Sequence, residues 1–516
     1  MGVHQKFGGM LMLSLALATP SLMRAQLGGA GSGGGPASRA QQLPLSGRAG
    51  QPGSVAPVQN NLPGGAQSVN TITSSVQVQG AYQGSVLSSE TAGAPFDLSL
   101  ADAIKRGLQY NLGNVGFQNS IRQARGLRWT ELANLLPQVS ADALATEQQV
   151  DLAAFGFTFS FPGVSIPTVV GPFHYFDVRA HLTQSIANFT DRRNFRASEQ
   201  TLRATELSAQ DGRDLVVLAV TGGYLSILSA AARIDSAQAQ VVAAQATYRQ
   251  AVDRHDAGVT ARIDVTRSQV ELQVQQQRLI SQQTDFAKQK IQLGRVIGLP
   301  PGQDFMLTDS LLYTPLADLT LDQALRRAAA NRADLKSAQA QVQAAELVRK
   351  AATAERYPTA DLAADYGVIG TSPVNSHGTF SVTGTVRVPI WQGGRVHGDI
   401  EQADAALQQR RAEYQDLRGR VDADIRQAFL DLTAAASQVT VSQSNRDLAR
   451  DTLAQSRDRF AAGVADTIEV IQAQESVAAA EQDYISSLFA HNLAKASLAR
   501  AMGQAEQGIQ QLLGRP

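Results

Sequence analysis

Apolar side chains recur every seven residues over four long stretches of the chain. The first two stretches lie on either side of Gly258 and carry Val220, Ile227, Ile234, Val241 and Tyr248, then Val265, Leu272, Leu279, Phe286 and Leu293. The other two flank Gly463 and carry Ile425, Leu432, Val439, Leu453 and Phe460, with Arg446 interrupting, then Val470, Val477, Tyr484, His491 and Leu498. Such a repeat predicts long helices packed in coiled-coil fashion. Because each glycine lets the chain reverse, we expect two long antiparallel helical hairpins.

The proline-free run over 197–255 separates this interpretation from a pair of ordinary buried helix pairs. At about 1.5 Å per residue, such a helix could reach roughly 90 Å, which a compact globule cannot hold.

The hairpin sequence occurs twice at a constant offset of 205 residues. Ala257-Gly258-Val259 recurs as Ala462-Gly463-Val464, and the closing Gly298 recurs as Gly503. Further upstream, Leu98 to Ile104 resembles Leu319 to Leu325 at an offset of 221 residues. A repeat this long exceeds any solenoid unit. It indicates a duplicated half-domain and a pseudo-twofold fold.

Each half is expected to begin with a helix that carries its own capping signal. Ser99 and Thr320 are predicted N-caps, with Asp102 and Gln323 three residues later. The helices are expected to run unbroken to about residues 135 and 355, because Pro137 and Pro358 follow.

After each proline the apolar period changes from helical to two. Apolar residues alternate with polar ones at Phe176, Val178, Ala180 and Leu182, at Leu362, Ala364, Tyr366 and Val368, and at Phe380, Val382, Val386, Val388 and Ile390. This predicts one β-hairpin in each half, with turns near 162–171 and 371–378.

The strand pattern fits either a soluble sheet lying on the helices or transmembrane barrel strands. A secretory signal, together with an expected lack of any membrane-spanning helix, favours the barrel. Four strands cannot close a barrel alone, since closed bacterial barrels have eight or more. We therefore expect several chains to pool their strands, and three chains would supply about twelve.

The domain organisation follows from these patterns. We expect a secretory signal peptide over 1–25, a disordered Gly-, Pro-, Ser- and Gln-rich segment over 26–94, a first repeat over 95–300, a linker over 301–318, a second repeat over 319–503 and a C-terminal tail over 504–516. A buried N-terminal helix is the alternative for residues 1–25.

Composition narrows the function classes. The 516 residues include 45 basic and 45 acidic side chains, so no nucleic-acid partner is implied. There is no cysteine, and the seven histidines have no ligand-like spacing. With no nucleophile–base pattern and no phosphate-binding loop, we expect no enzyme, no metal and no cofactor.

The chain resembles the TolC-like outer-membrane efflux proteins. The resemblance is carried by Leu319 to Leu325, by Pro358, by the stretch Val388-Pro389-Ile390-Trp391-Gln392-Gly393-Gly394-Arg395, and by the two glycine turns. It covers about residues 96–503, although 184–192 of the first half lacks the proline and paired glycines of the second.

The resemblance implies a mixed, mostly α fold in a homotrimer. A twelve-stranded β-barrel would cross the lipid of the bacterial outer membrane, and a helical α-barrel would extend into the periplasm. A belt around its middle would use the linker and the tail. It further implies the passive exit duct of a tripartite efflux or type I secretion system, which docks with a periplasmic adaptor protein and an inner-membrane transporter.

The hairpin turns are the predicted gate and docking point, because they lie farthest from the barrel. The candidate residues are Asp256, Gly258, Val259, Asp264, Gly463, Val464, Asp466 and Glu469. Acidic residues there would form rings in a trimer and favour cations. Helix capping is the alternative for Asp264 and Glu469, whereas Asp466 is the expected ring residue.

A secreted coiled-coil scaffold without a pore remains the alternative for the whole protein, and the cargo stays open between drugs, metals and proteins.

Overall fold

The computed structural model describes residues 54–62, 71–88, 93–156, 167–315, 319–372 and 374–512, all within one compact unit, Arg39–Pro516. The predicted signal peptide lies outside these residues. The elements before and within the first repeat are β1 (Val55–Leu62), β2 (Thr71–Val78), η1 (Gly80–Gln83), β3 (Phe96–Leu98), α1 (Leu100–Tyr110), α2 (Leu112–Ala133), β4 (Gln138–Asp151), η2 (Ala153–Phe155), β5 (Val169–Ala187), α3 (Phe189–Asp256) and α4 (Arg262–Val296). Those that follow are β6 (Phe305–Leu307), α5 (Leu321–Asn331), α6 (Ala333–Ala354), β7 (Thr359–Gly370), β8 (Ser376–Arg387), α7 (Arg395–Ala461), α8 (Thr467–Ala501) and α9 (Ala505–Leu512).

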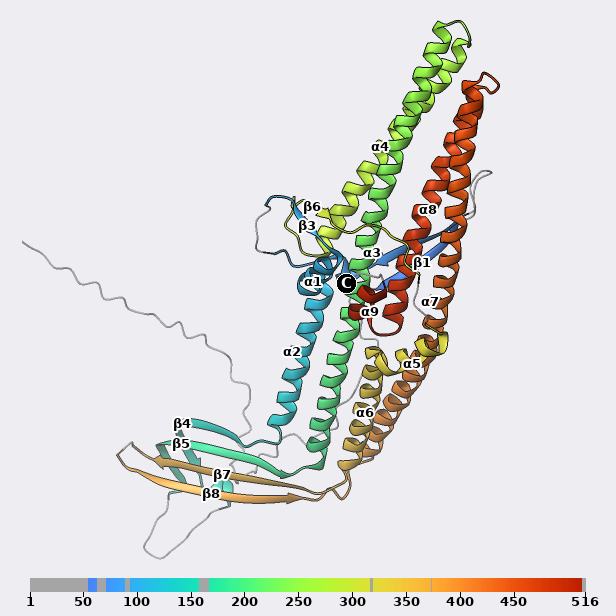
Figure 1. Ribbon diagram of the computed structural model, residues 1–516. Coiled ribbons are helices and arrows are strands. Elements are labelled where there is room, and N and C mark those ends of the chain that lie inside the picture. Colours follow the sequence, from blue (N-terminus) through green and yellow to red (C-terminus); the bar gives the residue numbers. More distant parts are fainter. Residues whose placement is uncertain are drawn as a thin grey trace, which may run out of the picture. The chain divides into compact units, whose positions relative to one another are not determined.

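The two predicted helical hairpins are confirmed. Helix α3 has 68 residues and α7 has 67, and each reverses into a partner of 35 residues, α4 or α8. At about 1.5 Å per residue, α3 and α7 each extend roughly 100 Å. Both begin beside the sheet and end at the glycine turns (Figure 1).

The helices pack as a layer whose members change along its length. Near the sheet, α3 lies between α2 and α6, and α6 contacts α7, which gives the order α2-α3-α6-α7. Toward the turns, α3 lies between α4 and α8, and α8 contacts α7, which gives the order α4-α3-α8-α7. Helices α2 and α4 therefore form one flank of the layer, and α7 forms the other.

The duplication is visible in the ion pairs that bind each short helix to its long one. Arg128 of α2 lies 3.2 Å from Glu199 of α3, and Arg349 of α6 lies 2.6 Å from Asp404 of α7. The arginines are 221 residues apart and the acids 205 residues apart, as the repeat requires.

The strands form an antiparallel sheet in the order β4-β5-β7-β8. One face carries an ionic network in which Arg179 of β5 contacts Asp177 at 3.1 Å, Thr379 of β8 at 3.2 Å, and Asp365 of β7. The opposite face is apolar and exposed, with Phe380 77% and Val382 66% accessible. The predicted alternation is therefore present, and the turn predicted near 371–378 lies between β7 and β8. The other predicted turn, near 162–171, lies outside the described residues up to 166, and β5 already begins at Val169.

The predicted helix starts are confirmed, but the predicted unbroken helices are wrong. Ser99 accepts a hydrogen bond from the Asp102 amide, and Thr320 forms a reciprocal capping box with Gln323. Each helix then breaks, at Asn111 and at Arg332. Asn111 ends α1 and caps α2 through the Gly113 amide, while its side-chain amide donates to the Tyr82 carbonyl at 2.9 Å. The break at Asn111 therefore combines a local N-cap with a tertiary hydrogen bond.

Part of the segment predicted to be disordered, 26–94, is folded. Strands β1 and β2 pair antiparallel, and β2 packs on α3 and α8. Val76 sits against Gly222 of α3, where the missing Cβ makes room, and Tyr82 is fully buried. The alternation Val76, Val78 was a strand signal that the surrounding polar composition obscured.

The linker and tail also form structure around α1. Strand β6 of the linker pairs in parallel with β3, and α9 packs on α3 and α8. Leu98, Leu218, Leu293 and Phe305 belong to the core cluster enclosed there.

The expectation that no helix could span a membrane is also wrong. Residues 215–232 of α3 carry no charged side chain, and by length and composition α3 could cross a bilayer. Most of the apolar window lies inside the protein, however, against the core that contains Leu218 and Leu225. It therefore behaves as a core helix.

Filling the space above Gly222 should dislodge the β1–β2 hairpin. A Cβ at this position would lie 2.4 Å from the Val76 side chain. We expect Gly222→Val to cost about 1–3 kcal/mol of unfolding free energy and to open strands β1 and β2 to protease. Gly126→Val is the matched control, since no described atom lies within 4 Å of its Cβ position. Equal melting temperatures and equal protease resistance in the two variants would contradict this packing.

Candidate gate at the hairpin turns

The two hairpin turns have the same backbone geometry. After α3, the amides of Gly258 and Val259 donate to the carbonyls of His255 and Arg254 at 2.9 and 2.8 Å. After α7, the amides of Gly463 and Val464 donate to those of Phe460 and Arg459 at 3.1 and 3.0 Å. These paired bonds form a Schellman motif, which requires a left-handed residue after the helix.

The glycines supply that conformation. Gly258 has φ +74° and Gly463 has φ +77°. No described atom lies within 4 Å of either Cβ position, so the backbone, rather than crowding, selects glycine here.

The turns expose apolar side chains to solvent. Val259 is 71% and Val464 67% accessible, and Ile263 and Ile468 beside them are also exposed. The predicted residue Asp256 is the last residue of α3 and is likewise exposed. These turns therefore present a mixed apolar and acidic surface.

The carboxylates agree with the helix-start alternative, since all three lie at the starts of α4 or α8. Asp466 caps α8, since its Oδ1 accepts from the Glu469 amide at 3.0 Å. Asp264 and Glu469 lie in first helical turns instead and pair with arginines: Asp264 with Arg267 at 3.6 Å, and Glu469 with Arg459 at 3.1 Å. The capping role thus falls on Asp466, because it alone directly precedes its helix.

Arg254 is the residue at the turns that the sequence prediction missed. Its guanidinium donates to the Ala461 carbonyl at 3.0 Å and lies 4.2 Å from the centre of the Phe460 ring. It therefore ties the first turn to the second. Arg459 occupies the same place in the repeat, which was the signal that could have drawn attention to it.

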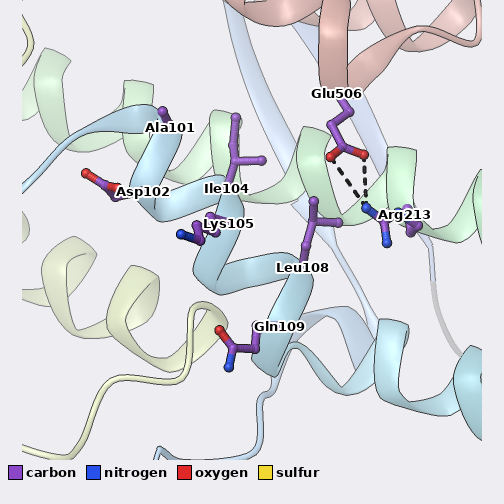
Figure 2. Close-up of a pocket in the computed structure, with 8 residues that line it drawn as sticks. All are labelled: Ala101, Asp102, Ile104, Lys105, Leu108, Gln109, Arg213 and Glu506. Carbon is purple, nitrogen blue, oxygen red and sulfur yellow. Dashed lines mark hydrogen bonds and ion pairs between the residues drawn. The ribbon is translucent and has the colours of Figure 1, made fainter.

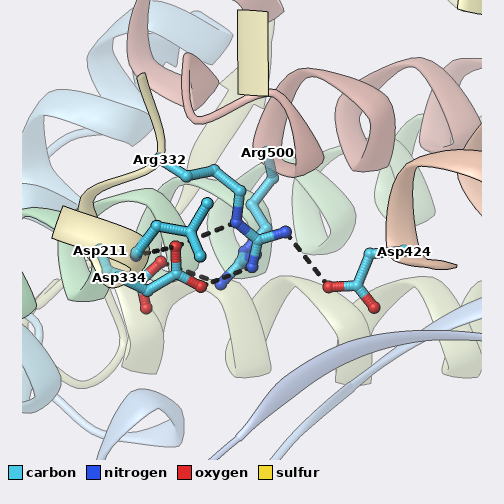
Figure 3. Close-up of polar contacts among 6 residues, drawn as sticks. Asp211, Arg332, Asp334, Asp424 and Arg500 are labelled. Carbon is cyan, nitrogen blue, oxygen red and sulfur yellow. Dashed lines mark hydrogen bonds and ion pairs between the residues drawn. The ribbon is translucent and has the colours of Figure 1, made fainter. Parts of the chain in front are cut away.

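A buried ionic cluster joins the two repeats at the far ends of α4 and α8 from the turns. Arg500 of α8 lies 3.0 Å from Asp211 of α3, and Arg332 lies 2.6 Å from Asp334 and 3.2 Å from Asp424 (Figure 3). Arg332 is almost fully buried. Removing one partner of such a cluster would leave an uncompensated charge.

The same region contains an open pocket of about 530 Å³ between α1, α3 and α9 (Figure 2). Three of its charged side chains have structural partners: Arg213 lies 3.1 Å from Glu506, and Asp102 accepts from the Ser99 hydroxyl at 2.6 Å. The Arg213–Glu506 ion pair thus holds α9 against α3. The described residues that line the pocket form no reactive constellation.

A sequence profile of outer membrane efflux proteins matches residues 118–299 and 324–513. The chain belongs to this family. The outer membrane efflux match covers both repeats, and it confirms the predicted family, the outer-membrane location and the role of an efflux channel. It favours the channel over the coiled-coil scaffold.

Known relatives support the assignment. The toluene efflux pump outer membrane protein TtgF of Pseudomonas putida is 23% identical over 400 residues, which span 74% of this chain and 78% of that protein. Protein CyaE of Bordetella pertussis is 27% identical over 304 residues, which span 58% of this chain and 63% of that protein.

Solved structures confirm the mostly α, mixed fold. The outer membrane protein VceC of Vibrio cholerae has a TM-score of 0.66 at 19% identity, covering 78% of this chain and 96% of VceC. The open-state outer membrane channel MtrE of Neisseria gonorrhoeae has a TM-score of 0.66 at 17% identity, covering 82% of this chain and 95% of MtrE. The neighbours are channel proteins rather than enzymes.

Asp214 of α3, which lies near Asp211 and Arg500 of the buried ionic cluster, predicts a pH-dependent stability. Burial, together with the nearby Asp211 carboxylate, raises the pKa of Asp214 to about 7. The folded protein then holds a proton between about pH 4 and 7 that the unfolded chain has released, so stability should fall as pH rises across this range, by up to about 1.4 kcal/mol per pH unit.

Asp214→Asn should flatten this dependence, as measured by unfolding in detergent at pH 5 and pH 7. Asp235→Asn, at an exposed position of the same helix, is the control. The same pH dependence in Asp214→Asn as in the wild type would contradict the assignment.

Proposed function

We propose that three copies of this chain form a hollow duct, the passive exit of a tripartite efflux or type I secretion system. The observation that carries the proposal is that both flanks of the chain are open, in the sheet and in the helical layer alike. A layer with two unsatisfied flanks can cover both by joining further copies of itself, and a head-to-tail contact of this kind generates a ring when the rotation between copies closes.

The sheet supplies the first pair of open flanks. Strands β4 and β8, of 14 and 12 residues, each pair on one side only within the described part of the chain. Long exposed strand edges invite pairing, and in lipid every backbone group must be satisfied. Pairing β4 of one copy with β8 of the next satisfies both edges, and three copies give a barrel of about twelve strands.

The two faces of the sheet suit such a barrel. The exposed apolar face, with Val178, Phe380 and Val382, would meet lipid, and the network around Arg179 would line an aqueous lumen.

The helices supply the second pair of open flanks. Ile280 of α4 is 56% exposed, whereas its repeat counterpart Ile485 of α8 is 5% exposed. Leu430 of α7 is 69% exposed, whereas its counterpart Leu225 of α3 is 1% exposed. A stripe of exposed apolar residues follows each flanking helix: Ile263, Val270, Val274, Ile280 and Ile291 on α4, and Leu430, Val441 and Leu448 on α7. Contact between α4 and α7 of adjacent copies would bury both.

A water-filled tube lets polar solutes cross the lipid without desolvation, which otherwise costs several kcal/mol per charge. In this proposal the channel itself supplies no energy for transport. Export is driven by an inner-membrane transporter, and a periplasmic adaptor joins that transporter to the exposed surface at the turns. That TtgF is named as part of an efflux pump supports this arrangement.

The turns form the gate in this proposal. Three copies bring three pairs of turns to one end of the tube, with Asp256, Val259 and Val464 at the constriction. Arg254 holds the two turns of each copy together, and adaptor docking spreads them.

Purified protein should conduct ions when reconstituted into planar bilayers, and it should run as heat-modifiable trimers from outer-membrane fractions. The duct explains both results, because a barrel resists detergent and encloses water. A secreted scaffold without a pore gives neither a conductance nor a heat-modifiable band, and that outcome would remove the proposal.

Bulky substitutions at the turn glycines should block export without breaking the trimer. Gly258→Trp and Gly463→Trp place a large side chain where only a left-handed backbone fits, at the predicted constriction. We expect cells to accumulate the exported compound while native gels still show trimers. Gly156→Trp is the matched control, since Gly156 has φ +80° and an equally open Cβ position at the end of η2, beside the sheet. Export at the wild-type rate in both turn variants would argue against the gate.

A further inference from the structure

Two aromatic side chains meet where the strands end and the long helices begin. Strand β5 ends just before α3, and α6 ends just before β7 (Figure 1). The ring of Phe189, at the start of α3, lies edge to face with that of Tyr357, which follows α6, and the ring centres are 6.0 Å apart. This contact brings the start of α3 and the end of α6 together at the edge of the sheet.

Three arginines lie beside this aromatic pair. Arg192 and Arg196 follow Phe189 by three and seven residues, so these side chains share one face of α3. Arg356 directly precedes Tyr357 in the sequence. All three arginines are exposed. We call Phe189, Tyr357 and the three arginines the junction corner.

The carboxylates near the junction corner already have partners. Glu199 lies 3.2 Å from an arginine of α2, and Glu355 lies 2.6 Å from Arg395. Asp191 is buried and accepts from the Asn188 side-chain amide at 2.6 Å. Within the described part of the chain, no carboxylate pairs with any of the three corner arginines. The junction corner is therefore a locally positive surface.

The junction corner also exposes apolar surface next to the sheet. Phe189 and Tyr357 are each almost half exposed, and Ile186, near the end of β5, is 64% exposed. Exposed aromatic side chains at the ends of membrane strands are typical of the boundary between hydrocarbon and lipid headgroups. The corner thus combines an apolar part beside the strands with a basic part farther along α3.

The spacing along α3 places two of the arginines at headgroup depth. At about 1.5 Å per residue, Arg192 lies about 4.5 Å and Arg196 about 10 Å beyond Phe189. The headgroup layer on each side of the hydrocarbon is roughly 5–7 Å thick, and a long arginine side chain can reach back toward it. Arg203, which is also exposed, lies about 21 Å beyond Phe189, outside this layer.

The internal duplication does not account for these arginines. At the offset of 205 residues, His397 and Glu401 of α7 correspond to Arg192 and Arg196. A glutamate at this place would repel an anion, so the second repeat lacks the basic face. The junction corner therefore occurs once in each chain, and it reflects a property of the first repeat alone.

We propose that the junction corner binds the headgroup of an anionic phospholipid in the membrane leaflet that faces the periplasm. Arginine guanidinium groups donate paired N–H bonds to phosphate oxygens, while Phe189 and Tyr357 pack against the upper part of the acyl chains. The apolar half of the corner is the reason to choose a lipid over a free anion. The inference rests on the proposed duct, in which the sheet crosses the lipid, and adds one lipid site per chain.

Three such sites would surround a ring of three copies just below its barrel. Each bound lipid would fix the depth of one chain in the membrane, because a guanidinium–phosphate contact tolerates little axial displacement. The three sites together would hold the barrel level while the far ends of the helices move.

Lipid retention by the intact protein tests the proposal. Trimers in detergent receive equal amounts of phosphatidylglycerol and phosphatidylcholine with the same acyl chains, and native mass spectrometry counts the lipids retained. We expect the wild type to retain phosphatidylglycerol preferentially. Since each arginine near the surface contributes about fivefold to binding of an anionic lipid, Arg192→Gln with Arg196→Gln should reduce the preference by roughly 25-fold.

Matched variants separate lipid binding from damage to the fold. Arg203→Gln removes an exposed charge from the same helix beyond headgroup depth, and it should keep the wild-type preference. Arg192→Lys with Arg196→Lys preserves the charge and should keep most of the preference. Native gels should show trimers for every variant. Inorganic phosphate added in place of the lipids should leave bound phosphatidylglycerol undisturbed, and its displacement by phosphate would overturn a lipid site.

Conductance in planar bilayers separates this inference from the function on which it rests. A wild-type protein that forms neither trimers nor pores would overturn the duct and the lipid site together. Conducting trimers that retain both lipids equally, or that lose the preference equally in Arg203→Gln, would overturn the lipid site alone. A double glutamine variant with altered ion selectivity and unchanged lipid retention would place the arginines in the lumen, which also overturns it.

Discussion

The structure depends on the need to pair backbone hydrogen-bonding groups: the sheet of a single chain, with two unpaired edge strands, cannot be stable in lipid. Within the described residues, β4 and β8 each pair on one side only. In water an edge strand can be solvated, but the hydrocarbon core of a membrane offers no partner for a free amide or carbonyl. The same chain has bare flanks in its helical layer, where Ile280 and Leu430 are exposed. The proposed ring of three copies would cover the sheet edges and the helical flanks with the same contact between neighbours.

Duplication explains how one sequence could meet that requirement, since its two similar halves already pack side by side inside each chain. Within the chain, the Arg500–Asp211 and Gln474–Thr247 contacts join the two halves. The two halves differ at the middle of the long helices, where the N-terminal hairpin covers α3 rather than α7. Gly222 admits Val76 of the β1–β2 hairpin, whereas the counterpart of Gly222 in α7 is Gln427. The N-terminal hairpin, the linker strand β6 and α9 therefore cover the first repeat's core and leave the flank of α7 free.

Much of this architecture could be predicted from the sequence, because the helices and strands are long and strongly periodic. The structure agrees with the local signals in the sequence. These are the seven-residue apolar period, the helix caps at Ser99 and Thr320, and the glycine turns. The helix break at Asn111 was not predicted, although Asn111 is a favoured N-cap residue, because its hydrogen bond to the distant Tyr82 carbonyl is not visible in the sequence. The β1–β2 hairpin was missed because its stability comes from packing on α3 and α8 rather than from its own composition.

At the candidate gate, too, local features could be predicted from the sequence, whereas contacts between distant residues could not. Gly258 and Gly463 were identified because a left-handed turn demands glycine, and the backbone angles agree. The ring role of Asp466 stays a prediction, and its capping contact depends on where α8 begins, because helix boundaries are the least predictable part of an element. Arg254 was overlooked because its partners, Ala461 and Phe460, are more than 200 residues away.

Imaging of single particles of the purified protein in detergent tests the central claim most directly. Three chains should surround a continuous hollow, with β4 of each chain beside β8 of the next and α4 beside α7. A filled monomer whose sheet folds back against its own helices would contradict it.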